Sequence, residues 1–377
     1  MRVAVVHDWL YTLGGAEQVL REILRCYPNA DVFTLFDALT PEDREKIGFK
    51  KARTSFLQRM PFIRTKHRAY LPLMPIAIEQ FDLSGYDLVI SSSYAVAKGV
   101  ITGPNQLHVS YVHSPMRYAW DLQHAYLKEA GVRGLSGLLA RWILHYMRIW
   151  DVRTSNGVDR FVAISHFIAR RVRKAYGRTA AVVYPPVDIA RFQLHRQKDD
   201  YYLTASRMVP YKRMPLIVEA FAKMPERRLV VIGDGPDMEL VRAAAGPNVE
   251  ILGRQSDAAM TDYMARARAF LYAAEEDFGI VPLEAQACGT PVVAYGRGGS
   301  LETIRGHDEP GQTGVFFPEQ SVDAIVAAVS HLDTRAVQPE DCRTNAERFS
   351  TQVFRDGLMA AVEDAMAAHR EEMRLGR

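Results

Sequence analysis

The stretch from Glu276 to Glu284 is the part of the sequence whose residue types and spacing point most specifically to chemistry. Its two glutamates are separated by seven residues, among which Phe278-Gly279 offers a turn and Pro282 suits the first turn of a helix. A helix that begins here would direct free N–H groups at phosphate oxygens, and the carboxylates could accept hydrogen bonds from sugar and ribose hydroxyls. The glutamates could also simply complement the helix dipole. Because Glu284 precedes the small residues AQACG and should be largely buried, an unpaired carboxylate there would be costly, which favours a binding role.

Arg207 and Lys212, in the segment SRMVPYKR, form a second candidate. A departing diphosphate develops negative charge, and two fixed cations beside it would stabilise that charge more in the transition state than in the ground state. The same segment also contains Arg213, so these cations could equally belong to a solvated face. Considered alone, the segment is more typical of such a face.

A glycine pair and a histidine are further candidates. Gly14-Gly15, after the apolar run RVAVVH, would let the first loop approach phosphates closely, although glycines also simply permit turns. His113, after LHVSYV, could hydrogen-bond a transferred sugar, although a histidine at a strand end is more often structural. All four candidates follow apolar runs that are typical of buried strands. Ligands of doubly wound sheets bind beyond the carboxyl ends of the strands, so this shared location is evidence for a site.

The elements that position these residues are predicted by the pattern of apolar runs and amphipathic stretches. Runs typical of buried strands are RVAVVH, DVFTLF, YDLVISSS, LHVSYVH, RFVAIS, YYLTAS, RLVVIGDG, VEILG, AFLYAA and PVVAYG. Because helical stretches separate them, the predicted fold class is α/β, with parallel sheets covered on both faces. A proline-rich and charged segment around 184–198 indicates a connection between two doubly wound domains, 1–185 and 186–352. Residues 353–377 should form a helix that caps its own domain or crosses back to the first; its apolar stripe is Phe354, Leu358, Val362 and Met366.

Length and composition are those of an ordinary two-domain globular protein. The 377 residues are 48% hydrophobic and 24% charged, with a net charge of +3. No run approaches the roughly 18 to 20 apolar residues that cross a bilayer, and MRVAVVHDW lacks a signal-peptide pattern, so a cytoplasmic protein is expected. The three cysteines lie far apart without CxxC or histidine-rich spacing, so neither a disulfide framework nor a metal site is predicted.

Together these residues resemble the GT-B-fold retaining glycosyltransferases of family 4, over nearly the whole chain. The resemblance rests on the E-x7-E element, the Arg207/Lys212 pair, GDGP at Gly233 to Pro236 and the Gly14-Gly15 pair. It implies two Rossmann-like domains facing a central cleft. The N-terminal domain would bind the acceptor, and the C-terminal domain would bind a nucleotide sugar as donor.

The resemblance also implies a role for each matching residue. The catalytic residues would be His113, Arg207, Lys212 and Glu276. The donor-binding residues would be Gly14, Gly15, Arg207, Lys212, Gly233, Arg254, Glu276, Phe278, Gly279, Ile280, Val281 and Glu284. In the family, the matching arginine and lysine bind the donor diphosphate, the first glutamate contacts the sugar and the second contacts the ribose. The glycine loop closes on the phosphates, the histidine lies by the sugar, and Arg254 would lie near the base.

Two further segments, HSPMRYAWD and SSSYAVAKG, are similar to bacterial mannosyltransferases that assemble O-antigen and exopolysaccharide repeat units. This similarity implies GDP-mannose as donor and a glycan or polyprenyl-diphosphate-linked acceptor, with Arg117 and Tyr118 near the acceptor. By resemblance, the reaction retains the anomeric configuration, and the acceptor hydroxyl arrives from the side on which the diphosphate leaves. No cofactor or metal is expected, because the cations and the helix dipole supply positive charge and the sequence contains no Asp-x-Asp.

A basic segment between Lys50 and Ile78 holds seven cations and no carboxylate. The cations are Lys50, Lys51, Arg53, Arg59, Arg64, Lys66 and Arg68. Interleaved with aromatic and aliphatic residues, they could bind an anionic membrane at about 1 kcal/mol each and present a lipid-linked acceptor. This interpretation places the protein peripherally on the inner face of the cell membrane. The same residues could instead be ordinary snorkelling side chains on two amphipathic helices.

Other functions remain open from the sequence. A nucleotide-sugar epimerase of similar architecture would use the same phosphate site without an acceptor, and a related transferase could use a UDP-sugar. A nicotinamide dehydrogenase is disfavoured because GDGPDM breaks the G-x-G-x-x-G fingerprint at Met238. A nucleic-acid-binding module would need its cations along a groove, and paired Rossmann-like domains give no reason to expect one.

Overall fold

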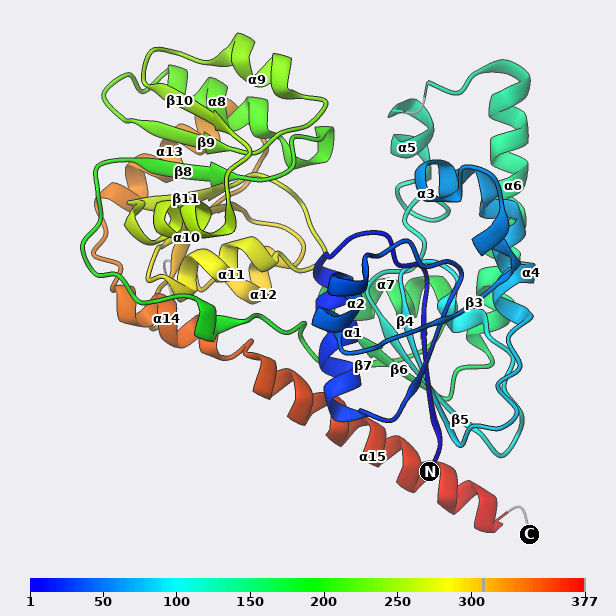
Figure 1. Cartoon of the computed structure of the whole chain (residues 1–377). Coiled ribbons are helices and arrows are strands. Elements are labelled where there is room, and N and C mark those ends of the chain that lie inside the picture. The colour runs from blue at the N-terminus through cyan, green and yellow to red at the C-terminus, as the bar shows by residue number, and fades with distance from the viewer. Residues whose placement is uncertain (130, 307–308, 376–377) are drawn as a thin grey trace. The chain divides into compact units, whose positions relative to one another are not determined.

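The computed structural model of the chain describes residues 1–129, 131–306 and 309–375. These residues form two compact units, each built around one parallel sheet (Figure 1). Unit 1 comprises Met1–Pro186 with Phe354–Arg377, and unit 2 comprises Val187–Val353.

The sheet of unit 1 has, within the described residues, seven parallel strands in the order β3-β2-β1-β4-β5-β6-β7. The strands are β1 Val3–His7, β2 Asp31–Thr34, β3 Arg53–Thr54, β4 Leu88–Ser93, β5 Leu107–Val112, β6 Arg160–Ala163 and β7 Ala180–Val182. The chain first runs outward from β1 to β3 and then returns to β4, so the strand order reverses between β1 and β4. His7 lies opposite Ser92 at this point. Ligand sites of doubly wound sheets lie at such reversals.

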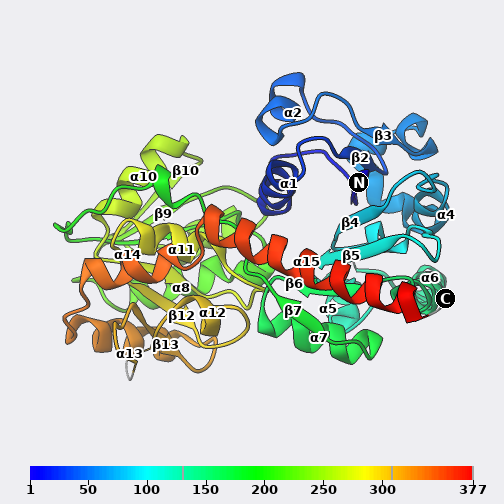
Figure 2. The ribbon, with the colours of Figure 1, turned by 90° about the horizontal axis from the view of Figure 1, so that it is seen from below.

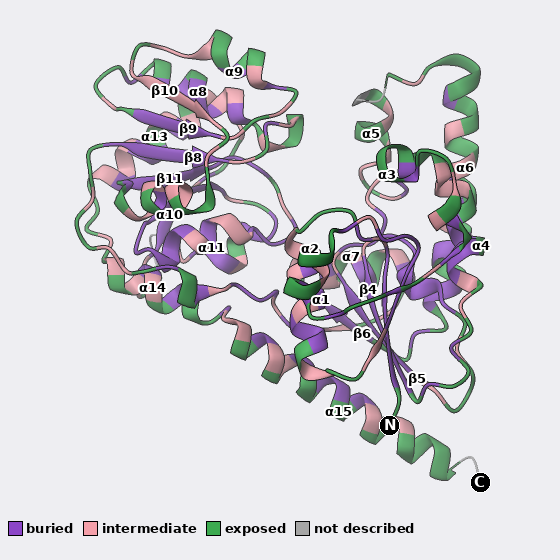
Figure 3. Cartoon of the chain, in the orientation of Figure 1, coloured by how far each residue is buried: buried purple, intermediate pink, exposed green. Residues whose placement is uncertain are grey.

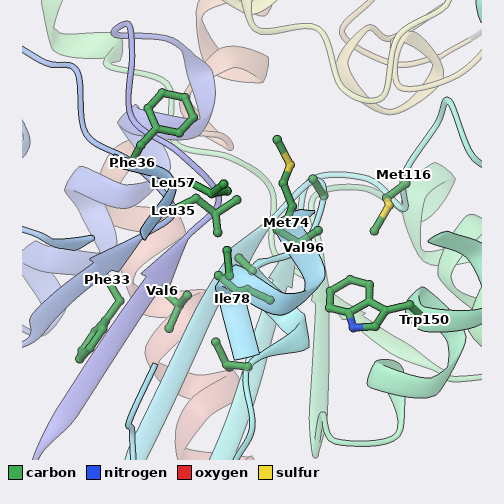
Figure 4. Close-up of a cluster of buried hydrophobic side chains, with 14 of the residues drawn as sticks. Val6, Phe33, Leu35, Phe36, Leu57, Met74, Ile78, Val96, Met116 and Trp150 are labelled. Atoms are coloured by element: carbon green, nitrogen blue, oxygen red, sulfur yellow. The ribbon is translucent and has the colours of Figure 1, made fainter. Parts of the chain in front are cut away.

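Helices surround this sheet and close one core with it. They are α1 Gly15–Cys26, α2 Pro41–Ile47, α3 Ile63–Lys66, α4 Met74–Glu79, α5 Gln123–Glu129, α6 Gly134–Ser155 and α7 His166–Tyr176. Figure 4 shows side chains of β1 and β2, including Val6 and Phe33, in one cluster with Met74 and Ile78 of α4 and Trp150 of α6. The core therefore fixes α4 and the C-terminal half of α6 to the sheet.

Asp8, directly after β1, ties the carboxyl ends of β1 and β4 together. Its fully buried carboxylate accepts backbone N–H bonds from four consecutive residues, 94–97, at 2.6–3.0 Å. A buried carboxylate is tolerated only when such donors satisfy it. This arrangement fixes the edge of the sheet at which the strand order reverses.

The sheet of unit 2 has, within the described residues, six parallel strands in the order β10-β9-β8-β11-β12-β13. The strands are β8 Tyr202–Ala205, β9 Leu229–Ile232, β10 Val249–Gly253, β11 Ala269–Tyr272, β12 Val292–Tyr295 and β13 Gly314–Phe317. Helices that follow them are α8 Met214–Ala222, α9 Met238–Ala244, α10 Asp257–Arg266, α11 Ile280–Ala287, α12 Ser300–Thr303, α13 Val322–Asp333 and α14 Pro339–Glu347. The order is that of a dinucleotide-binding sheet, and it reverses between β8 and β11. All residues of these two strands are buried, and Figure 3 shows both strands in the colour of buried residues.

Helix α15, Thr351–Leu375, leaves unit 2 and packs on unit 1. Figure 2 shows it lying across the strands of unit 1. Its buried residues are Phe354, Leu358, Ala361, Val362 and Ala365. The ring of Phe354 meets that of Tyr111 in β5 at 5.6 Å, and Nη1 of Arg355 lies 2.6 Å from Oε2 of Glu22 in α1. The predicted stripe thus faces unit 1, with Met366 only partly buried at its end.

The predicted α/β class with two parallel sheets is confirmed, and each of the ten apolar runs contains a strand. The short strands β3, β7 and β13 were not predicted. Within the described residues, no helix is long and apolar enough to cross a membrane.

Candidate functional site

Lys212 and Glu276 meet in unit 2 at the reversal of the strand order. Lys212 ends the short turn that follows β8, and Glu276 follows β11, the neighbouring strand. The Lys212 ammonium contacts Oε1 of Glu276, and the Tyr272 hydroxyl donates a hydrogen bond to Oε2. The two charged side chains are only 13% and 19% exposed. This part of the site therefore holds a shielded cation whose partner carboxylate is fixed from its other side.

Aromatic rings complete the surroundings of Lys212. Its ammonium lies 5.3 Å from the ring centroid of Tyr211 and 5.5 Å from that of Tyr272. Burial, followed by the charge of Glu276, raises the pKa of the Tyr272 hydroxyl well above its usual value. Tyr272 consequently stays protonated and remains a donor to Glu276. The sequence interpretation did not include Tyr272, although its place at the end of AFLYAA marks it as a strand-end residue.

The loop after β12, which contains Gly298 and Gly299, fixes the backbone of Glu276. This contact was also not predicted from the sequence. The Gly299 N–H donates to the Glu276 carbonyl at 2.7 Å. A Cβ at Gly299 would lie 2.4 Å from Cα of Phe278, and one at Gly298 would lie 2.4 Å from the Glu276 carbonyl oxygen. Only residues without a side chain allow this close approach of two backbones. The run GRGGS after PVVAYG is the signal that could have revealed it.

Gly233 holds the loop that carries Arg207. At its φ of 139°, a Cβ would lie 1.9 Å from the Ser206 carbonyl oxygen, so the loop after β9 packs directly on the loop after β8. The Met208 N–H also donates to the Asp234 carbonyl at 2.9 Å. Arg207 itself is exposed. The structure thus gives Gly233 a positioning role, and its contact with a donor stays a prediction.

Helix α11 begins where the sequence predicted. Gly279 is its N-cap, with a φ of 94° that favours glycine, and Ile280 and Val281 follow as half-buried residues. The first N–H groups of a helix have no partner within the helix and suit an anion. Phe278 is only 4% exposed and its ring meets that of Phe349 at 5.6 Å, so its side chain belongs to the core. Any contact of Phe278 with a donor would therefore come from its backbone.

Glu284 lies one turn inside α11 and is half-buried. Burial raises the pKa of its carboxyl from 4.5 to about 7, against the opposing effect of Arg191. The group therefore titrates near neutral pH. Perturbed carboxyl groups of this kind cluster at functional sites.

If Glu284 contacts the ribose of a nucleotide donor, as the resemblance implies, its raised pKa makes the affinity for that nucleotide depend on pH. Only the ionised carboxylate can accept hydrogen bonds from both ribose hydroxyls, so GDP binding should strengthen as the pH rises through about 7. Stability should change in the opposite direction: the folded state binds the proton more tightly than the unfolded state, so the free energy of unfolding should fall over the same rise. Calorimetric titration with GDP at several pH values measures the first effect. The Glu284→Gln variant, which cannot ionise at this position, should show a shallower profile, in which only the terminal phosphate of GDP and other groups titrate. A profile as steep as that of the parent would contradict the assignment.

In unit 1, His113 belongs to a buried chain of polar side chains. Its Nε2 lies 2.8 Å from Oγ of Ser92, and the same Oγ lies 3.1 Å from Nδ1 of His7. Nε2 of His7 in turn faces Oε1 of Glu17 at 3.6 Å. This series of polar side chains starts at the reversal between β1 and β4 and ends in the first turn of α1.

This arrangement favours one tautomer of His113. Burial, followed by the charge of His7, lowers the pKa of His113 to about 3, so the ring is neutral at physiological pH. If His7 is neutral and carries its proton on Nε2, which faces the Glu17 carboxylate at 3.6 Å, Nδ1 of His7 accepts the Ser92 hydroxyl proton. Ser92 then accepts from Nε2–H of His113, and Nδ1 of His113 is left as an acceptor. A neutral acceptor of this kind suits a sugar hydroxyl better than a cation would.

The glycine pair is linked to the same chain. The Gly14 N–H donates to Oε2 of Glu17 at 2.9 Å, and a Cβ at Gly14 would lie 3.1 Å from that oxygen. The Gly14 amide is therefore engaged by the capping of α1, whereas Gly15 begins the helix. Phosphate binding by Gly14 and Gly15 stays a prediction.

All seven cations of the basic segment are exposed. Phe62, at their centre, is 73% exposed and has a φ of 55°. Phe49, directly before Lys50, and Ile63, between two of the cations, instead belong to the buried core. The alternative interpretation, a pair of amphipathic helices, does not match this described segment, which holds the strand β3, two short 3-10 helices and the helices α3 and α4 of four and six residues.

Arg117, Tyr118 and Arg254 are the remaining predicted residues. Arg117 and Tyr118 are half-buried, and the Tyr118 hydroxyl is buried without a hydrogen-bond partner among the described atoms. Arg254 is exposed directly after β10. Within the described residues, no three His, Cys, Asp or Glu side chains gather in a way that could hold a metal ion.

The fold is shared with solved glycosyltransferase structures. HepE from Anabaena, solved in complex with UDP, superposes with a TM-score of 0.69 over 97% of this chain and 100% of that chain, at 18% identity. The fold is therefore of the GT-B class, as predicted. Two family models also match: residues 13–191 match "Glycosyltransferase Family 4" and residues 187–349 match "Glycosyl transferases group 1". Because the two models together span most of the sequence, the chain belongs to the group 1 glycosyltransferases of family 4, and the predicted family is confirmed.

Curated relatives are similar over part of the chain. The GDP-mannose-dependent alpha-(1-6)-phosphatidylinositol monomannoside mannosyltransferase of Mycolicibacterium smegmatis is 30% identical over 212 residues, covering 48% of this chain and 54% of that protein. The GDP-mannose-dependent monoacylated alpha-(1-6)-phosphatidylinositol monomannoside mannosyltransferase of Corynebacterium glutamicum is 32% identical over 178 residues, covering 39% and 47%. The chain spans about half the length of these relatives.

Proposed function

We propose that this glycosyltransferase moves mannose from GDP-mannose to a lipid-diphosphate-linked or other glycan acceptor, with retention of the anomeric configuration and without a metal ion. In bacterial surface polysaccharide synthesis this would be one step of repeat-unit assembly. Residues 1–185 would bind the acceptor and residues 186–352 the donor.

The observation that carries the proposal is the contact of Lys212 with Glu276 at the strand-order reversal of unit 2, beside the start of α11. A shielded ammonium, the exposed Arg207 guanidinium and the first N–H groups of a helix together suit a diphosphate. In the proposed reaction these groups stabilise the charge that develops on the leaving GDP. Glu276 would exchange its contact with Lys212 for a hydroxyl of the sugar.

The chemistry needs no protein nucleophile. The acceptor hydroxyl forms the new bond to the anomeric carbon on the face from which the diphosphate leaves. Its proton passes to the departing phosphate oxygen, so charge and atoms balance without an added base. Neutral His113 would accept a hydrogen bond from the sugar through Nδ1 and orient it.

The donor and the acceptor are supported by the relatives rather than by a bound ligand. Both relatives named above are GDP-mannose-dependent, and both act on phosphatidylinositol mannosides, which are lipids. The exposed cations between Lys50 and Arg68, with the exposed ring of Phe62 among them, suit an anionic membrane in which such an acceptor would lie. We therefore propose peripheral association with the inner face of the cell membrane.

A donor panel tests the proposal. Purified protein should release GDP from GDP-mannose only when a lipid-linked acceptor extract is added, and EDTA should leave the rate unchanged. NMR of the product should show the anomeric configuration of the donor. Inversion of configuration, or loss of activity with EDTA that magnesium restores, would contradict the respective part of the proposal.

A UDP-sugar is the second candidate donor, because the structurally similar HepE was solved with UDP and also with UDP-glucose. Preference for UDP-glucose in the same panel would favour it over GDP-mannose. Conversion of a nucleotide sugar without any acceptor would instead support the epimerase.

A further inference from the structure

Helix α6 exposes a continuous apolar stripe that no element of the described structure covers. Its residues are Leu135, Leu138, Leu139, Trp142, Tyr146 and Ile149, and they are between 38% and 85% exposed. At 100° per residue, these positions fall within an arc of about 100°, so they form one face of the helix along roughly 21 Å. Figure 3 shows much of α6 in the colour of exposed residues. Large apolar residues gathered on one exposed face mark an interaction surface.

The opposite face of α6 is firmly attached to unit 1. Leu144, Met147 and Trp150 lie in the core. Nζ of Lys98 lies 2.6 Å from Oδ1 of Asp151, and both side chains are almost fully buried. Helix α6 therefore has two apolar faces. One packs in the core of unit 1, and the other, the stripe, is exposed although the helix is fixed in place.

The charges around the stripe indicate what covers it. Arg133 at the N-cap and Arg141 are exposed cations, Arg153 is exposed but pairs with the Glu79 carboxylate at 2.8 Å, and the acidic residue within α6, Asp151, is buried. A second copy of the chain packed stripe to stripe would bring these cations together. An anionic bilayer complements both the cations and the apolar face, and Trp142 and Tyr146 are residue types that favour the interface between headgroups and acyl chains.

From this geometry we infer that α6 is a membrane-docking helix, which lies in the surface of an anionic bilayer with Leu135 to Ile149 buried among the acyl chains. The inference rests on the proposed function, which places the acceptor on a lipid. It concerns residues that belong neither to the donor site nor to the basic segment 50–68. The two surfaces also differ physically, because binding through cations weakens with salt whereas apolar insertion does not.

Vesicle binding by a stripe variant tests the inference. The variant is Leu135→Ser/Leu138→Ser/Leu139→Ser, and the matched control is Leu240→Ser/Leu375→Ser, which replaces similarly exposed but isolated leucines. Flotation uses vesicles of equal parts phosphatidylglycerol and phosphatidylethanolamine, at low and high salt. The stripe variant should bind at least about 100-fold more weakly than the parent, and the control should bind like the parent. Equal binding of the stripe variant and the parent would overturn the inference.

Two further measurements distinguish the alternatives. Brominated lipids should quench the fluorescence of Trp142, and this quenching should be absent from the Trp142→Phe variant. If sedimentation instead shows a lipid-free dimer that the stripe variant abolishes, a second copy covers the stripe and the inference is wrong. The vesicle assay contains neither donor nor acceptor, so a failure to bind vesicles would not contradict the proposed sugar transfer. Likewise, a failure of the donor panel would not change the result of the vesicle assay.

Discussion

Replacement of Lys212 by alanine should lower kcat/KM for the nucleotide sugar by about 10³-fold, the effect of removing one preorganised group that stabilises developing charge. Lys212 is shielded between two aromatic rings and contacts Glu276, so water cannot readily replace it. Its loss would also leave the Glu276 carboxylate to repel the diphosphate. Steady-state kinetics with a saturating acceptor measures the effect.

Lys223 provides the matched control. It also pairs with a carboxylate of unit 2, Asp323, at 3.2 Å, but both side chains are well exposed. Lys223→Ala should therefore leave kcat/KM within about twofold of the parent, as expected for an exposed ion pair. If Lys212→Ala stayed within a few-fold of the parent while folded normally, the assignment of the diphosphate site would be wrong.

The second large effect is expected from Gly299→Ala. The backbone of Gly299 has an ordinary φ of −67°, so the substitution tests space alone. The new Cβ would lie 2.4–2.7 Å from backbone atoms of Asp277 and Phe278, which cannot give way as a flexible side chain can. The loop that carries Glu276 must shift, and a shift of about 1 Å in a positioning group costs about 100-fold in rate. Thermal unfolding should also show a loss of about 1–3 kcal/mol, typical of overpacking.

Gly103→Ala is the control for this prediction. The nearest atom to its new Cβ is a side-chain oxygen of Gln106 at 3.5 Å, an ordinary contact distance. Both kinetics and unfolding should match the parent. An unchanged kcat/KM for Gly299→Ala would show that the loop from Gly298 to Ser300 does not position Glu276.

The strands were predictable because their apolar runs are continuous and bounded by turns, as in AFLYAA before Glu276. The same pattern placed Lys212 and Glu276 at strand ends. The contact between Lys212 and Glu276 could not be predicted from the sequence, because it requires β8 and β11 to be neighbours in the sheet. Two strands lie between them in the chain. Strand β3 is only two residues long, which is too short for any periodicity.

Contacts between distant residues account for most of what the sequence did not reveal. His7 and Ser92 are 85 residues apart, so nothing local indicated that Ser92 joins His7 to His113. In α6, apolar residues occur on both faces, as in LLARWILHYMRIW, so periodicity could not indicate which face is buried. Phe49 and Ile63 lie among cations in the sequence, yet the fold places them in the core.

The path of α15 has a consequence for how the protein is made. Unit 2 is one continuous stretch, whereas unit 1 is completed only by residues that follow it. During synthesis, domains fold as units once their residues have left the ribosome. Although most of unit 1 is translated first, the contacts of Phe354 with Tyr111 and of Arg355 with Glu22 can form only after the whole of unit 2 has been translated.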